Sequence, residues 1–172
     1  MKKILVALFV IFASLSVNAQ DLYMGGTFNL WRDYDANRTS FRVEPEIGYN
    51  LNKQWALGLN FTYAHEYNKG LKANSVAIAP YARYSFYENK IVRLFIDGGL
   101  GFATTRIKEV DDSVNGYEIG FKPGIALKLN THFSLIAKCG FIGFRDDYVV
   151  GGDGLGINLR SEDLSFGFHY EF

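Results

Sequence analysis

The sequence predicts an all-β protein, an eight-stranded antiparallel up-and-down transmembrane β-barrel. The chain of 172 residues is rich in Phe (15) and Tyr (11) and holds only 3 Pro, a composition typical of strands. Apolar residues recur at every second position in eight successive segments, which is the period of a strand. The opposite face of these segments combines small residues with charges of both signs, as the interior of a narrow membrane barrel requires.

Length, charge and cysteine content exclude several classes of protein. A chain of this length forms one domain. The formal net charge is zero, so nothing indicates a nucleic-acid partner. A single Cys excludes a disulfide framework and a Cys-rich zinc site.

Residues 1–19 have the pattern of a secretory signal peptide. Lys2 and Lys3 precede an apolar run, and Val17 and Ala19 place small residues at positions −3 and −1 of a cleavage site. A membrane anchor is the alternative, but the run is shorter than the ~20 residues that a spanning helix needs. We therefore expect residues 20–172 to form the mature outer-membrane β-barrel domain.

The first four alternating segments lie at 22–30, 41–51, 55–63 and 76–86. The third shows the pattern most clearly, with Trp55, Leu57, Leu59, Phe61 and Tyr63 on one face. The last four lie at 92–102, 117–129, 133–141 and 164–172. In the seventh, Cys139 and Phe141 are expected to face outward. Tyr81, Phe95, Ile136 and Ile142 are apolar exceptions that fall on the inner face.

The connections between these segments alternate in length. Those near 50–54, 87–91 and 129–132 are short, whereas those near 32–40, 65–74, 103–115 and 144–160 are long and polar. Short turns at one end and long loops at the other indicate an up-and-down barrel with both termini in the periplasm.

A faint internal repeat marks the even-numbered segments. The stretch from Pro45 to Asn52 aligns with the stretch from Pro123 to Asn130, and Pro80 begins a related one. Proline removes a ladder donor and usually marks a strand edge or a bulge.

The inner face carries a predicted network of charged groups that fill the lumen. Their near balance of sign favours mutual pairing, because an unpaired buried charge is costly. The network consists of Arg42, Glu44, Glu46, Arg83, Arg93, Asp97, Glu118, Lys122, Lys128, Lys138, His169 and Glu171. In a soluble barrel this face would instead meet water, but eight strands leave too little room for the bulky apolar side chains that would then lie inside.

The C-terminal residues carry a resemblance to a known family. The last strand alternates Phe166, Phe168, Tyr170 and Phe172 and closes on a terminal Phe. The chain resembles small Gram-negative outer-membrane barrels, namely the transmembrane domain of outer membrane protein A and the outer membrane protein X type, and also small barrels common in Bacteroidetes. The resemblance implies that these four residues are the signal for the barrel-assembly machinery, and that the protein resides in the cell outer membrane.

Candidate chemistry is sparse. His132 and Ser134 have the spacing found in lipid A deacylases, but they lie at a short, periplasmic turn. His65 begins a long connection beside Glu66. Carboxylates that could attract a hard cation occur at Asp111, Asp112, Asp146, Asp147 and Asp153 without a calcium-binding repeat. We therefore predict no catalytic residue, no bound metal and no cofactor.

The sequence thus favours a non-enzymatic envelope protein with a plugged lumen, acting in adhesion, shielding or membrane integrity. A lipid-modifying barrel enzyme is the alternative, and a soluble lipocalin-like carrier is a third hypothesis. Outer-membrane lipid, lipopolysaccharide and the assembly machinery are the expected partners of a monomer, with no nucleic acid. The partner of the outer connections is left open.

Overall fold

The computed structural model describes residues 21–172 except for 36, 69, 109–111, 150–152 and 161–162. The predicted signal peptide lies outside the described residues. Among the residues that are described, no helix is long and apolar enough to cross a membrane.

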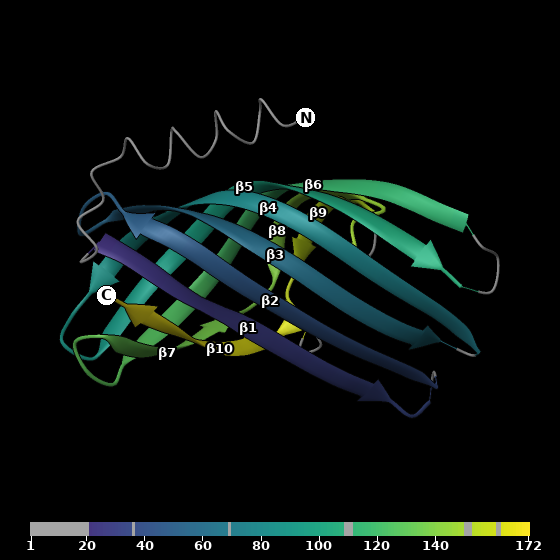
Figure 1. Cartoon of the computed structure of the whole chain (residues 1–172), viewed down its shortest axis with the longest axis horizontal. Coiled ribbons are helices and arrows are strands. Elements are labelled where there is room, and N and C mark those ends of the chain that lie inside the picture. The colour runs from purple at the N-terminus through teal and green to yellow at the C-terminus, as the bar shows by residue number, and fades with distance from the viewer. Residues whose placement is uncertain (1–20, 36, 69, 109–111, 150–152, 161–162) are drawn as a thin grey trace.

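The described part of the chain forms ten antiparallel strands (Figure 1). Their bounds are β1 (Leu22–Asp33), β2 (Arg38–Asn50), β3 (Trp55–Asn68), β4 (Leu71–Glu88), β5 (Val92–Ile107), β6 (Asp112–Lys128), β7 (Phe133–Lys138), β8 (Phe141–Asp146), β9 (Gly154–Asn158) and β10 (Ser165–Glu171).

These ten strands occupy eight positions around a closed barrel. β1 to β6 pair in chain order. β7 and β8 both pair with β6 and together form the seventh barrel strand. The eighth consists of β10, which pairs with β7, and β9, which pairs with β8. Closure comes from β10 and β1, which pair from Tyr23↔Glu171 to Phe28↔Phe166. The predicted eight-stranded barrel is confirmed.

Large apolar side chains face outward and charged ones inward. Leu57 on β3 is 50% exposed and Phe121 on β6 is 53% exposed, whereas Glu46 and His169 are each 3% exposed. A water-soluble barrel would bury the first pair and expose the second. The inverted arrangement places the apolar band against lipid, because only a hydrocarbon solvent favours it. Tyr81, Phe95 and Ile136 lie inside as expected.

Three of the four predicted long loops are instead extensions of the strands. The β1–β2, β3–β4 and β5–β6 hairpins continue almost to their tips, so that only 34–37, 69–70 and 108–111 connect them. Asn68 still pairs with Leu71, and Ile107 with Asp112. The sequence hid these strands because both faces turn polar beyond the membrane, which removes the alternation without removing the backbone hydrogen bonds.

The seventh barrel strand contains one extra residue, which corrects the predicted faces of Phe141 and Ile142. β6 pairs Gly124 with Lys138 and Phe121 with Ile142, so between these pairs three residues of the seventh strand oppose two of β6. Gly140 has a φ of +71°, a left-handed conformation that glycine adopts most readily. The bulge turns Phe141 inward, where it is 6% exposed, and Ile142 outward, where it is 37% exposed.

The repeat seen in the sequence has two structural parts. The first is the turn asparagine: the side-chain oxygen of Asn52 accepts hydrogen bonds from the backbone N–H groups of Gln54 and Trp55, both at 2.9 Å. Asn89 and Asn130 make the same pair of bonds in the other two short turns. Each bond satisfies a turn N–H, so the three asparagines fix the turns at one end of the barrel.

The second part is the proline. In the ladder between β2 and β3, the pairing passes from Val43↔Tyr63 to Glu46↔Asn60 and skips Pro45. The ladder between β4 and β5 skips Pro80 in the same way, and Pro123 lies opposite the bulge after Lys138, where its carbonyl accepts a bond from the Cys139 N–H at 3.1 Å. Each proline therefore stands where no ladder donor is used, as proline requires.

Candidate functional site

The lumen is crossed at mid-depth by four charged side chains and a histidine, which we call the central cluster: Glu46, Arg83, Asp97, Lys138 and His169. They come from β2, β4, β5, β7 and β10. The Arg83 guanidinium donates from Nε and Nη2 to the two oxygens of Asp97 at 2.6 and 2.9 Å, and Nη2 also donates to Glu46 at 3.3 Å. The Lys138 ammonium lies 2.7 Å from Glu46 and 3.2 Å from Asp97.

His169 completes the central cluster from the last strand. Its Nε2 bonds to Glu46 Oε1, and its Nδ1 lies 3.2 Å from Arg83 Nη1. The side chains of the five residues are between 0 and 9% exposed. Strands on all sides of the barrel thus contribute to one ion-paired group, which satisfies charges that would otherwise be costly to bury.

Aromatic rings fill the space around Arg83. Its guanidinium carbon lies 4.1 Å from the ring centre of Phe95, 5.3 Å from Tyr81 and 5.5 Å from Tyr23. These are cation–π distances. The hydroxyl groups of Tyr23 and Tyr81 bond at 2.8 Å. A Cβ at Gly58 would lie 2.4 Å from the Tyr81 ring, so glycine on the facing strand is what leaves room for the ring.

Three further charged groups lie above and below the central cluster. Toward the hairpin end, Glu118 accepts hydrogen bonds from Arg145 at 2.9 and 3.1 Å and from Lys122 at 2.5 Å. On the same side, Arg42 lies 3.9 Å from Glu44.

At the short-turn end, Arg93 bridges Glu88 and Glu171 at 3.2 and 2.7 Å, and Lys128 also bonds to Glu88. By the general rule for membrane barrels, short turns face the periplasm and longer connections the exterior, so we expect the hairpins to lie outside.

The structure brings eleven of the twelve predicted lumen residues into ion pairs and His169 into a hydrogen bond with Glu46, but in separate groups rather than one continuous network. Sequence reasoning missed Arg145 and Glu88 as partners, and Tyr23 and Tyr148 as buried rings. Tyr23 has the inner parity of its segment and could have been found. Arg145 could not, because the bulge at Gly140 shifts the parity before it.

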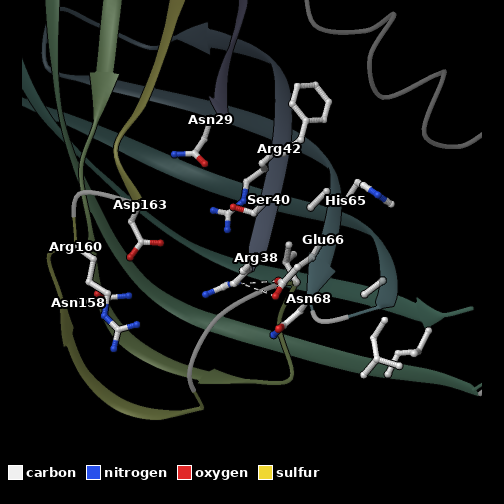
Figure 2. Close-up of a pocket in the computed structure, with 16 residues that line it drawn as sticks. Asn29, Arg38, Ser40, Arg42, His65, Glu66, Asn68, Asn158, Arg160 and Asp163 are labelled. Carbon is white, nitrogen blue, oxygen red and sulfur yellow. Dashed lines mark hydrogen bonds and ion pairs between the residues drawn. The ribbon is translucent and has the colours of Figure 1, made fainter. Parts of the chain in front are cut away.

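The groups divide the lumen into two vestibules. The outer vestibule, at the hairpin end, has a volume of about 490 Å³ and is lined in part by Asn29, Arg38, Arg42, Glu66, Asn158 and Arg160 (Figure 2). The inner vestibule, lined in part by Glu88 and Arg93, has a volume of about 300 Å³. Between the central cluster and the Glu118 group lies a much smaller cavity, with a volume of about 40 Å³.

The remaining histidines lie apart from the lumen groups. His65 Nδ1 contacts the side-chain oxygen of Asn74 at 2.7 Å, and Ser75 bonds to Thr105. His132 contacts the backbone oxygen of Glu171 at 2.9 Å beside the C-terminus and stacks on Tyr170. Across the described residues, three or more His, Cys, Asp or Glu side chains do not come together as metal ligands. Asp111 lies outside the described residues, and Asp153 accepts a bond from the Asp147 N–H at 2.8 Å.

The four residues of the C-terminal motif occupy the outward face. Phe166, Phe168, Tyr170 and Phe172 are between 41 and 53% exposed. Their role as an assembly signal stays a prediction.

A closed barrel with an apolar exterior and an ion-paired interior defines an integral β-barrel membrane protein. The chain matches the family described as "Outer membrane protein beta-barrel domain" over residues 4–172, and it belongs to that family. Its location is the cell outer membrane.

Two solved structures show the same fold. The N-terminal β-barrel domain of Pseudomonas aeruginosa OprF is similar at 17% identity and a TM-score of 0.58, over 89% of this chain and 98% of that chain. Neisserial surface protein A (NspA) is similar at 12% identity and a TM-score of 0.54, over 88% of this chain and 95% of that chain. A comparison with curated proteins found no match.

Proposed function

We propose that this protein is a non-enzymatic, non-conducting component of the outer membrane that stabilises the envelope and presents β-hairpins at the cell surface. The central cluster is the observation that carries the proposal. Its four charged side chains, His169 and the rings around Arg83 cross the lumen from one wall to the other. Eight strands enclose an interior that side chains can fill completely, so this arrangement supports a closed barrel.

An ion could pass only by displacing a paired charge. Separating Arg83 from Asp97 and Glu46 would leave buried charges without partners, which costs several kcal/mol for each ion. Such a barrier supports an anchoring role for the barrel over a diffusion role.

The strand extensions support a role at the surface. The β1–β2, β3–β4 and β5–β6 hairpins project as paired strands, and cross-strand side-chain contacts stiffen them. Arg38 bonds to Glu66 at 2.8 Å, Arg32 to Thr39 at 2.6 Å and Thr104 to Asn115 at 2.9 Å. Preformed hairpins lose little conformational entropy on contact with a partner, as adhesion or shielding requires. In this proposal the protein acts as a monomer, surrounded by outer-membrane lipid and lipopolysaccharide.

Planar-bilayer recording tests the closed lumen. The wild-type monomer should give no steady conductance, whereas a variant that combines Arg83→Ala with Phe95→Ala should show transient or stable currents. Phe28→Ala, a truncation on the lipid-facing surface, is the matched control and should stay silent. Stable, ion-selective channels from the wild type would overturn the proposal.

The envelope role is tested separately in the native host. Deletion of the protein should raise envelope-stress signalling or reduce adhesion. Expression of the Arg83→Ala, Phe95→Ala variant in the deletion strain should return the affected trait to its wild-type level if the hairpins, and not the closed lumen, carry the function. A deletion strain that is unchanged in both assays would count against the envelope role.

A further inference from the structure

The barrel seam between its last and first strands is only partly closed by backbone pairing. The β1–β10 ladder ends at Phe28↔Phe166, yet β1 continues to Asp33. Within the described residues, β2 is the only ladder partner of that final stretch, and β8 is the only ladder partner of β9. A side-chain bond from Asn29 Nδ2 to the Leu164 carbonyl, at 2.6 Å, stands at the point where the ladder stops. We call the stretch beyond this bond the open seam.

Both edges of the open seam carry unusually exposed apolar side chains. Leu30 on β1 is 66% exposed, and Leu155 and Ile157 on β9 are 84% and 69% exposed. Lipid-facing leucines within fully paired strands are less exposed, for example Leu135 at 44%. Among the described residues, this part of β1 and β9 each have a ladder partner on one side only, so their apolar surface is open to lipid or to a bound apolar group.

The outer vestibule lies behind this seam. Asn158 and Arg160 approach from the β9 side, and Arg38 and Glu66 project from β2 and β3 (Figure 2). Asn29, at the end of the closed ladder, lines the same cavity. The volume of about 490 Å³ is within the range of small-molecule sites.

Three arginines give the outer vestibule its chemistry. Arg38, Arg42 and Arg160 are among its described lining residues, together with two carboxylates, Glu66 and Asp163. A guanidinium has five N–H donors, so an arginine that already binds a carboxylate, as Arg38 does, can still bind a second anion. Planar guanidinium groups bind phosphate in a two-pronged geometry.

We propose that the outer vestibule binds the phosphate of an outer-leaflet lipid, which enters sideways through the open seam. The phosphate group would lie against Arg42 and Arg160, and the acyl chains would cover Leu30, Leu155 and Ile157. The central cluster closes the lumen beneath, so the lipid is held and not passed on. The inference does not rest on the proposed envelope role, because a barrel with a blocked lumen could hold such a lipid whatever its role in the envelope.

A tryptophan at the open seam provides the test. Trp31 lies on β1 beyond the closed ladder, and the chain has only one other tryptophan, Trp55 at the opposite end of the barrel. The Trp55→Phe protein is folded into phosphatidylcholine vesicles that contain either dibrominated phosphatidic acid or dibrominated phosphatidylcholine at equal bromine content. Bromine quenches tryptophan on contact, so Trp31 reports which lipid occupies the seam.

We expect phosphatidic acid to quench Trp31 at least about threefold more strongly than phosphatidylcholine, which corresponds to roughly 0.6 kcal/mol of preference. Arg42→Gln and Arg160→Gln should each abolish the preference. Arg160 lies outside the strands, so its variant tests the site even if Arg42→Gln impairs folding. Arg106→Gln is the matched control, because Arg106 is at the same end of the barrel on the exposed outer face.

Two results would overturn the proposal. Equal quenching by the two lipids would mean that the seam does not select a phosphate group. If inorganic phosphate alone shifts the Trp31 emission through Arg42 and Arg160 while the two lipids still quench equally, the vestibule takes a soluble anion through its mouth and the seam plays no part.

Discussion

Leu59 lies midway along the lipid-facing row of β3, between the flanking aromatics Trp55 and Tyr63. Leu59→Arg should therefore destabilise the folded barrel in bilayers by about 2–4 kcal/mol, because it places a charge near the middle of the hydrocarbon. Tyr67→Arg, on the same strand and face but beyond the aromatic row, should cost at most about 1 kcal/mol. Urea titration of both variants in lipid vesicles measures the difference. Equal costs would show that the apolar band is misplaced.

Glu46 accepts bonds from Arg83, Lys138 and His169 in the central cluster, so its loss affects three partners at once. Glu46→Ala should lower the free energy of unfolding by about 3–5 kcal/mol, since cations are left buried without their partner. Glu171→Ala, at the more exposed rim, should cost less than about 1 kcal/mol. Unfolding by urea in detergent micelles provides the measurement.

Coupling within the central cluster can be measured in the same assay. The double variant Glu46→Ala, Lys138→Met should be less unstable than the sum of the two single variants, because the second change removes one of the unpaired charges. Strict additivity would mean that Lys138 and Glu46 do not act on each other.

At the scale of single residues, alternation alone predicted which side chains face the lumen, because a strand has only two faces. It did not predict which charges pair. Arg83 and Asp97 meet because their positions are directly opposite on β4 and β5. Glu46 and His169 lie on the two strands that flank β1 and meet over Gly25, which is paired with both. Such pairings depend on strand register and barrel curvature, which a single strand does not encode.

Among the elements, the seventh barrel strand makes the sharpest prediction. Deleting Gly140 removes the one extra residue of the bulge, so β7 and β8 should pair with β6 as one regular strand while Phe141 and Arg145 stay inside. The deletion should therefore fold. Deleting Gly143 should not, because it would turn Arg145 from Glu118 toward lipid. Folding of both proteins is read from their migration on gels without heating, and the opposite result would contradict the bulge.

The strands as elements were predicted where one face is apolar and missed where both are polar. The hairpin stretches around His65 and Asn74 are paired by backbone bonds that side-chain patterns do not report. The bulge was missed for a different reason. Phe141 and Ile142 are both apolar and adjacent, so either could be assigned to the lipid face until Gly140 fixes the choice.

At the scale of the whole molecule, β10 pairs with β1 on one side and with β7 on the other. The half of the barrel nearer the short turns therefore has no long free strand edge. A closed barrel resists unfolding by detergent. The unboiled protein should thus migrate differently from the boiled protein on gels. A chain truncated before Ser165 lacks β10 and should migrate identically in both conditions. Identical migration of the full chain would argue against closure.

The first strand of the barrel is paired with the last, from residue 23 to residue 171. Contacts between such distant parts of a chain form late, because a long loop must be closed before they contribute. Neighbouring hairpins, by contrast, can form early through their asparagine turns. The barrel therefore cannot be completed while its C-terminal strand is still emerging from synthesis or export. Folding into the membrane must wait for the whole chain, and the unpaired edges of β1 and β10 have to be kept from aggregating throughout that interval.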